Sequence, residues 1–379
     1  MINAKESILI KFVKTISIKI AENSKLKMYL AKYEFEKFSK YSYNYFLLAG
    51  DIGGTNSSIG VFGIMNGIPK LIVSFSFKSK EIKDFPATIN QVLNFVKKTY
   101  NTNVSKACFG VAGVVSPDNK QAKITKLNWH LSSKAIVKKT GLKQIIFIND
   151  FQAIGYGINL IEKNQFAVVK KGIKVPKSNI LVVGAGTGLG KTLLIYDKNQ
   201  KFYKPIASEA GHIDFPAQTE DEIKLIKFIK KYKKIKQNVS YEQVLSGPGL
   251  SNIYLFLKRS GKFDNTKYSK EIKNSSYNPE VISNYRKADK ACKVTFEIFR
   301  DTYARFARDM ALDGLSSGGV YIGGGIATKN KEVFDKQFIK IFEQSHDRAY
   351  ILKKMPINLI LDYNIGLLGA GFAGAKLLK

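Results

Sequence analysis

Two stretches of the chain place glycines between apolar, strand-like segments, a pattern that can bind phosphate. The first runs from Asp51 to Asn56 and the second from Gly184 to Thr192. Glycine lets backbone amides approach phosphate oxygens closely. A tight hairpin turn accounts for the first stretch equally well when that stretch is considered alone.

The second stretch resembles a Walker A loop but lacks its spacing. Ala185 occupies the position of the first required glycine, and a strand rather than a helix is predicted after Lys191. The dinucleotide-binding fingerprint fails too, because its glycines must open a helix. We therefore interpret Gly184 to Thr192 as a second phosphate-binding hairpin.

Two carboxylates follow predicted strands. Asp51 stands where it could hold a magnesium ion through water, as hard cations bound to nucleotide phosphates require. Asp150 follows Asn149 and a buried strand, and a carboxylate there can accept the proton of a hydroxyl that attacks a phosphoryl group. Taken alone, the Asn149-Asp150 pair fits a helix cap better than a catalytic base.

Strands and helices must hold these residues in position. The length of 379 residues fits two domains of ordinary size. Apolar patterning predicts strands at 46–49, 59–62, 71–77, 107–111, 145–148, 180–183, 192–196, 320–322 and 357–361. Helices are predicted at 86–98, 294–315 and 332–342, with a last glycine-rich helix near the C-terminus. Thr219 and Glu222 have the spacing of a capping box.

Composition limits the class of protein. The net charge of +31 invites a nucleic-acid hypothesis, but only six of 61 basic residues are Arg, the residue suited to bidentate phosphate and base contacts. We expect no specific nucleic-acid partner. No apolar run approaches the length of about 18 residues that predicts a membrane span, and Cys108 and Cys292 have no metal-ligand spacing.

Residues 1–45 differ from the rest of the chain. They contain no Gly, Pro or Arg and alternate short apolar clusters with lysines. Four glutamates and the absence of Arg are atypical of a mitochondrial presequence. We interpret this stretch as an N-terminal extension of unknown role.

Eight segments, in matching order, resemble bacterial-type glucokinases of the actin, heat-shock-70 and hexokinase superfamily. They are 51–56, Gly110-Val111-Ala112-Gly113, Leu127-Asn128-Trp129, Ile148-Asn149-Asp150-Phe151, 186–190, 209–215 (Glu-Ala-Gly-His-Ile-Asp-Phe), 245–250 (Leu-Ser-Gly-Pro-Gly-Leu) and Gly323-Gly324-Gly325-Ile326. The likeness covers residues 46–379. It implies an α/β, two-lobed, ribonuclease-H-like (actin-like ATPase) fold with a central cleft. The implied division is a small lobe of 46–160 completed by 365–379, and a large lobe of 161–364.

The resemblance also implies an activity, the transfer of the γ-phosphoryl group of ATP to the 6-hydroxyl of glucose. Asp150 is then the general base, and the hydroxyl-binding residues are Asn149, Glu209, His212 and Glu242. Considered singly, Glu242 fits a surface helix residue better, and His212 a structural imidazole. Nucleotide-binding residues implied by the family are Asp51, Gly53, Gly54, Thr55, Asn56, Gly186, Thr187, Gly188, Gly324 and Gly325. Magnesium at Asp51, a homodimer and a cytoplasmic location are implied as well.

Two departures matter. Repressor-type sugar kinases share the motif Glu209 to His212 but add a cysteine-rich zinc site, and no Cys occurs in Ile213 to Gln218. We therefore expect no metal beyond the nucleotide's magnesium. Where glucokinases commonly have Arg, this chain has Ser58. Any phosphate or lobe contact that the Arg makes in the family is therefore in doubt for this chain.

The alternative function is a sugar-responsive regulator that binds glucose and DNA without significant turnover.

Overall fold

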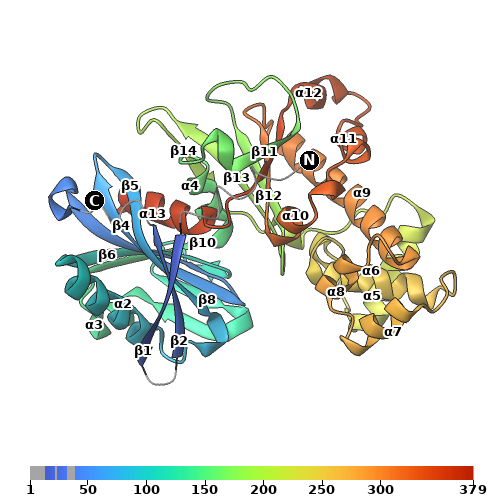
Figure 1. Ribbon diagram of the computed structural model, residues 1–379. Helices are drawn as coiled ribbons and strands as arrows, with labels where there is room; N and C mark the ends of the chain where they lie inside the picture. The colour runs from blue at the N-terminus through green and yellow to red at the C-terminus, as the bar shows by residue number, and fades with distance from the viewer. Residues whose placement is uncertain (1–12, 22–23, 32–38, 379) are drawn as a thin grey trace, which may run out of the picture. The chain divides into compact units, whose positions relative to one another are not determined.

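The computed structural model describes residues 13–21, 24–31 and 39–378. The chain divides into two compact units, one comprising Met1–Ile161 and Tyr363–Lys379 and the other Glu162–Asp362 (Figure 1). The lobe boundaries implied by the resemblance stay a prediction. Predictions for 1–12, 22–23 and 32–38 lie outside the described residues.

The first unit is built on a sheet whose strand order is β1-β2-β5-β4-β3-β6-β10. The strands are β1 (Val13–Ala21), β2 (Ser24–Ala31), β3 (Tyr45–Ile52), β4 (Asn56–Met65), β5 (Ile68–Lys78), β6 (Val104–Val111) and β10 (Gln144–Asn149). Strands β3, β6 and β10 are mutually parallel, so their carboxyl ends meet at one edge of the sheet. Asp51 and Asn149 both lie at that edge. Part of the predicted N-terminal extension forms β1 and β2, which lengthen this sheet beyond β5.

Helices and a small sheet complete the first unit. They are α2 (Phe85–Tyr100), α3 (Ser133–Lys139), α4 (Asp150–Gly157) and α13 (Ile365–Leu377), with β7 (Val114–Val115), β8 (Gln121–Ile124) and β9 (Trp129–Ser132). Aromatic rings fill the core between α2 and the sheet, with the Phe85 and Phe109 centroids 5.2 Å apart and edge-on. Helix α13 packs closely on α4, since the carbonyl of Ala153 occupies the place that a side chain at Gly369 would need. Glycine in α13 thus serves helix packing rather than flexibility.

The second unit contains a six-stranded sheet in the order β11-β16-β15-β12-β13-β14. Its strands are β11 (Phe166–Lys170), β12 (Ile180–Ala185), β13 (Leu189–Asp197), β14 (Phe202–Ile206), β15 (Val320–Gly323) and β16 (Ile357–Ile360). Its helices are α5 (Glu220–Lys233), α6 (Gly247–Arg259), α7 (Lys267–Asn274), α8 (Pro279–Asn284), α9 (Lys290–Asp313), α10 (Gly325–Lys329), α11 (Lys336–Phe342) and α12 (Ala349–Lys354). Strand β12 pairs antiparallel with β13 and parallel with β15, so the second glycine hairpin and the glycine triplet are neighbours.

Two local predictions were wrong. Thr219 caps α5 by accepting a hydrogen bond from the Glu222 amide, but the Glu222 carboxylate binds the Gln218 amide and Arg305 instead of closing a capping box. Buried Arg305 takes that carboxylate because an unpaired guanidinium would be costly in the core. The helix predicted at 332–342 begins only at Lys336, where Asp335 caps it. No helix among the described residues is both long and apolar enough to cross a membrane.

Candidate functional site

The first glycine loop connects β3 to β4 and is held from behind by a serine. The Gly53 amide donates to the Asn56 carbonyl at 3.1 Å, which closes the turn. Fully buried Ser79 donates its hydroxyl to the Gly53 carbonyl at 2.6 Å and its amide to the Thr55 carbonyl at 2.9 Å. Ser57 braces the Ser79 hydroxyl at 2.8 Å.

This brace fixes the direction of two peptide groups. The C=O and N–H of a trans peptide point in opposite directions, and the described residues contain no cis peptide bond. With the carbonyls of Gly53 and Thr55 turned toward Ser79, the amides of Gly54 and Asn56 point away from it. Amides presented together in this way can bind an anion.

Asp51 lies on β3 just before this loop and next to the start of α13. Its carboxylate contacts Gly366, since a Cβ added there would lie 2.5 Å from Oδ2. In the sheet Asp51 lies opposite Ser58 on one side and Gly110 on the other. Burial raises the pKa of Asp51 to about 6. A partly buried carboxylate with no cationic neighbour opposite it in the sheet suits a cation or its hydration shell.

A magnesium site of the nucleotide-bound kind fits these residues. Such ions keep several waters and use one or two carboxylates besides the phosphates, rather than a cage of protein ligands. Among the described residues no cluster of three or more His, Cys, Asp or Glu side chains could hold a metal ion. Asp51 provides one carboxylate beside the first loop, and one carboxylate is enough for this kind of site.

Asp150 opens α4, directly after β10 ends. Its Oδ1 accepts a hydrogen bond from the Phe151 amide at 2.9 Å. A Cβ at Gly110 would lie 2.7 Å from the Ala153 Cβ and 4.0 Å from the Asp150 Cα, so the glycine lets the first turn of α4 approach β6. Gly110 also pairs with Asp51. The two carboxylate residues therefore flank β6 at one edge of the sheet.

Asn149 is the N-cap of α4 and stabilises the start of that helix. Its Oδ1 accepts from the Phe151 amide at 2.9 Å, and its Nδ2 donates to the Gly113 carbonyl at 3.4 Å. Gln152 completes a capping box by accepting from the Asn149 amide. The helix-cap interpretation of this pair is thus confirmed, and the half-buried Asn149 amide also faces the Gly110–Gly113 turn.

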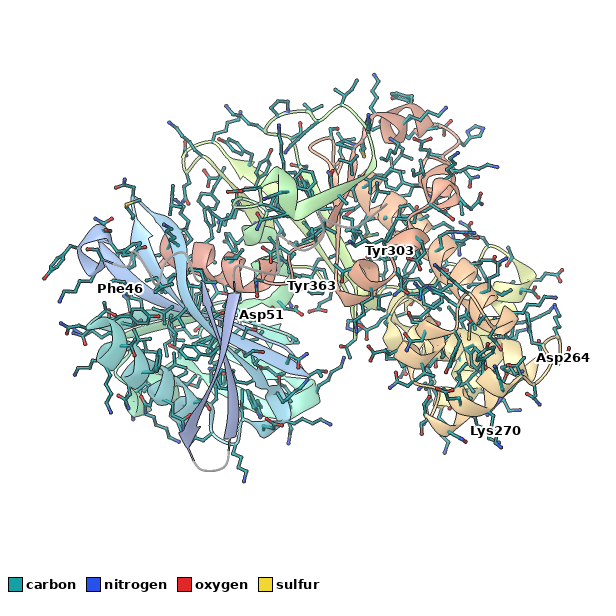
Figure 2. The ribbon with its side chains drawn as sticks, viewed as in Figure 1. Phe46, Asp51, Asp264, Lys270, Tyr303 and Tyr363 are labelled. Carbon is teal, nitrogen blue, oxygen red and sulfur yellow. The ribbon has the colours of Figure 1, made fainter. Side chains whose placement is uncertain are left out.

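The second glycine loop, Gly186–Gly188, connects β12 to β13. The Gly186 amide donates to the Gly188 carbonyl, and the Gly247 amide at the start of α6 donates to the Gly186 carbonyl, both at 2.8 Å. Beneath the loop, the buried Tyr303 hydroxyl accepts from the Ala185 amide at 3.2 Å (Figure 2). Lys191 pairs with Asp313 at 3.2 Å, so it acts as an anchor to α9 rather than as a Walker-type lysine.

Glu242 joins the predicted sugar-binding residues to this loop. Its Oε2 accepts from the Leu189 amide at 2.9 Å. The carboxylate fills the space beside Gly188, where a Cβ would lie only 2.6 Å from Oε2. On the other side, the Leu189 carbonyl occupies the position that a side chain at Gly211 would need. The segment containing Glu209 and His212 therefore packs against the same residue that Glu242 binds.

Glu209 and His212 lie at the two ends of one turn and are both exposed. His212 Nε2 is 3.8 Å from Glu209 Oε2. A bridge between Asp214 and Ser240 and a hydrogen bond of 3.0 Å from the Tyr241 amide to the Ile213 carbonyl tie this turn to the one bearing Glu242. The structure thus brings Glu209, His212, Glu242 and the second loop into one cluster.

The glycine triplet enters α10 beside the second loop. Gly324 has φ +91° and lies so close to the Ala185 carbonyl that a Cβ would be 2.5 Å from that oxygen. Gly325 is exposed and has no protein atom within 4 Å of its Cβ position. Backbone geometry and packing therefore require glycine at 324, while packing leaves open space at 325 for a ligand.

Paired substitutions in the second loop separate packing from binding. Gly188→Ala should push Glu242 off the Leu189 amide and destabilise the protein by about 1–3 kcal/mol, because a partly buried acceptor is separated from its donor. Gly186 has no atom within 4 Å of its Cβ position, so Gly186→Ala should change stability by less than about 0.5 kcal/mol. Thermal unfolding of both variants measures the change in stability, and ATP titration measures the change in nucleotide binding. Equal destabilisation would contradict it.

Sequence and structure comparisons agree on a family. The sequence model of the family described as Glucokinase matches residues 48–377. The glucokinase of Nostoc sp. is 33% identical over 346 residues, covering 87% of this chain and 99% of the relative. That of Synechocystis sp. is 30% identical over 352 residues, covering 87% and 98%.

Solved structures have the same fold. The glucokinase from an Antarctic psychrotroph is 27% identical with a TM-score of 0.72, covering 87% of this chain and 98% of that one. The Streptomyces griseus ROK family glucokinase, solved with glucose and AMPPNP, is 17% identical with a TM-score of 0.60, covering 87% and 99%. A ROK family transcriptional regulator at 14% identity shares only the fold, which does not favour the regulatory alternative. The chain belongs to the glucokinase family and is an ATP-dependent hexose kinase that phosphorylates glucose.

Proposed function

We propose that Asp150 is the general base that activates the 6-hydroxyl of glucose. The proton of that hydroxyl passes to Asp150 as the sugar oxygen bonds to the γ-phosphorus and the bond to the leaving ADP oxygen breaks. The observation that carries the proposal is the position of Asp150 at the carboxyl end of β10, two strands from Asp51 at the same sheet edge. There the proposed base and the first glycine loop belong to one compact unit.

The other residues divide into nucleotide and sugar ligands. Loop Gly53–Asn56 and loop Gly186–Gly188 bind the phosphates of ATP, and Gly324 with Gly325 lets adenosine lie against backbone. Asn149, Glu209, His212 and Glu242 bind glucose hydroxyls. The second oxygen of Glu242 leaves acceptor capacity for a hydroxyl while Oε2 holds the Leu189 amide.

Magnesium supplies positive charge to the phosphates when bound, and Asp51 would hold its hydration shell. The proposed fold is the two-lobed ribonuclease-H-like arrangement of the actin superfamily, supported by a glycine hairpin in each unit beside parallel strands. A homodimer and a cytoplasmic location complete the proposal on the resemblance alone.

The decisive experiment uses a sugar that lacks only the reacting group. Glucose should stimulate ADP release and give glucose 6-phosphate, whereas 6-deoxyglucose should bind competitively and release no ADP above background. A coupled assay measures the ADP, and mass spectrometry identifies the product. Phosphorylation of 6-deoxyglucose would show that another hydroxyl is the acceptor and would contradict the proposal that Asp150 activates the 6-hydroxyl.

A further inference from the structure

Lys126 covers the first phosphate-binding loop. The Cβ position that Gly54 lacks is 3.1 Å from Cδ, 3.2 Å from Cβ and 3.7 Å from Cγ of Lys126. The aliphatic stem therefore lies along the glycine. Gly54 is not one of the positive-φ glycines of the described residues, so its backbone conformation does not demand glycine, whereas the lysine stem needs the space.

The backbone that carries Lys126 is anchored in the core. Lys126 belongs to a short turn, Thr125–Leu127, between β8 and β9. Ile124 before it is fully buried, and Trp129 after it packs on Phe85 with ring centroids 5.7 Å apart. Because the stem already packs on Gly54 as far as Cδ, fixing the ammonium on an anion costs less freedom than it would for a lysine whose whole side chain is unrestrained.

The charge of Lys126 has the same sign as the loop beneath it. The Gly54 and Asn56 amides point away from Ser79, and Lys78 donates to the Asn56 side chain at 3.0 Å. A lysine stem packed on a loop whose backbone amides point outward brings positive charge beside a place that can bind an anion. The chemistry points to phosphate oxygens.

We propose that Lys126 binds the phosphate chain of the nucleotide held by loop Gly53–Asn56. This rests on the proposed function of that loop as an ATP site. The ammonium acts as a point charge on nonbridging oxygens, a role that lysine plays in other phosphate sites. Lys126 thus adds a second lysine, beside Lys78, to the backbone amides of this loop.

The test measures ADP and adenosine binding by calorimetry, so it does not depend on turnover. Lys126→Met keeps the stem over Gly54 and removes the charge. Lys126→Arg keeps the charge. Lys123→Met is the matched control, because Lys123 is exposed on β8 in the same small sheet and its removal changes the net charge equally.

We expect Lys126→Met to weaken ADP binding about tenfold, as loss of one charge-assisted phosphate contact does, with adenosine binding and thermal stability unchanged. Lys126→Arg should restore most of the affinity, and added KCl should weaken ADP binding more in the wild type than in Lys126→Met. Equal ADP affinity in Lys126→Met and Lys123→Met would overturn the proposal. Wild-type protein that binds no ADP would instead overturn the proposed function of the loop.

Discussion

Replacing Asp150 by Asn should lower kcat by about 10²–10⁴, the range that general-base assistance contributes. Asn retains Oδ1, which accepts the Phe151 amide in the wild type, so the start of α4 should survive. What disappears is the capacity to take a proton. A coupled assay of ADP release at saturating glucose and ATP measures kcat, and calorimetry with glucose measures binding.

The matched control is Asp84→Asn, since Asp84 caps α2 by accepting from the Ala87 amide at 3.1 Å and lies outside the proposed site. It should leave kcat within about twofold of the wild type, because surface substitutions away from a site have small effects. A loss of less than tenfold in Asp150→Asn, or an equal loss in Asp84→Asn, would contradict the base assignment. Glucose binding that falls together with kcat would indicate a role in binding instead.

The sequence predicted the two glycine loops better than it predicted the contacts that hold them in place. Glycines between apolar strands predicted both loops, because hairpins and phosphate sites demand the same residue type at close approach. Yet no pattern distinguishes Gly188, whose space is filled by Glu242, from Gly186, which faces open space. That difference depends on a residue more than fifty positions away, so it arises only from tertiary packing.

The supporting residues were missed for the same reason. Ser79, in the turn that follows β5, braces the first loop with the support of Ser57 on β4, and Tyr303 supports the second loop from a long helix. Serine and tyrosine are common and carry no spacing signal of their own. A buried serine directly after a strand that neighbours a glycine hairpin is the cue that could have found Ser79.

The structural interpretation of the Asn149-Asp150 pair does not compete with the proposed catalytic role of Asp150. The Asn149-Asp150 pair does begin a helix with a capping box. The same geometry fixes the carboxylate at the sheet edge, because a helix that starts at the end of a parallel strand has its first turn there. Capping and catalysis are therefore compatible at this position.

Asp51 should make the ligand-free protein less stable as the pH rises. Its folded-state pKa is raised to about 6 from an ordinary 3.8, so the folded protein holds the proton more tightly than the unfolded chain. This stabilisation is fully present below about pH 4. It is lost as the pH rises to 6, and the total change is up to about 3 kcal/mol. Asp51→Asn should remove this pH dependence of stability.

The check is the difference in unfolding free energy between Asp51→Asn and the wild type, measured by denaturant titration from pH 4.5 to 8 in EDTA. The unfolding free energy of the variant minus that of the wild type should increase as the pH rises and level off above about pH 7. The same variant should bind Mg-ATP more weakly, because the carboxylate that is unfavourable without ligand is the one proposed to hold the ion's hydration shell. A difference that stays flat with pH would contradict the raised pKa.

Ser58 offers the complementary change. It lies directly opposite Asp51 in the β3–β4 ladder, and side chains of such a pair share a face of the sheet with Cβ atoms about 4.5–5.5 Å apart. Ser58→Arg would place a guanidinium beside the carboxylate and lower its pKa, since a nearby opposite charge favours the ionised form. The pH dependence of stability between 4.5 and 8 should then largely vanish, as in Asp51→Asn, while the carboxylate remains. Both variants are expected to lose the pH dependence of stability. If only Asp51→Asn also weakens Mg-ATP binding, then Mg-ATP binding requires the carboxylate itself and not merely the local charge balance.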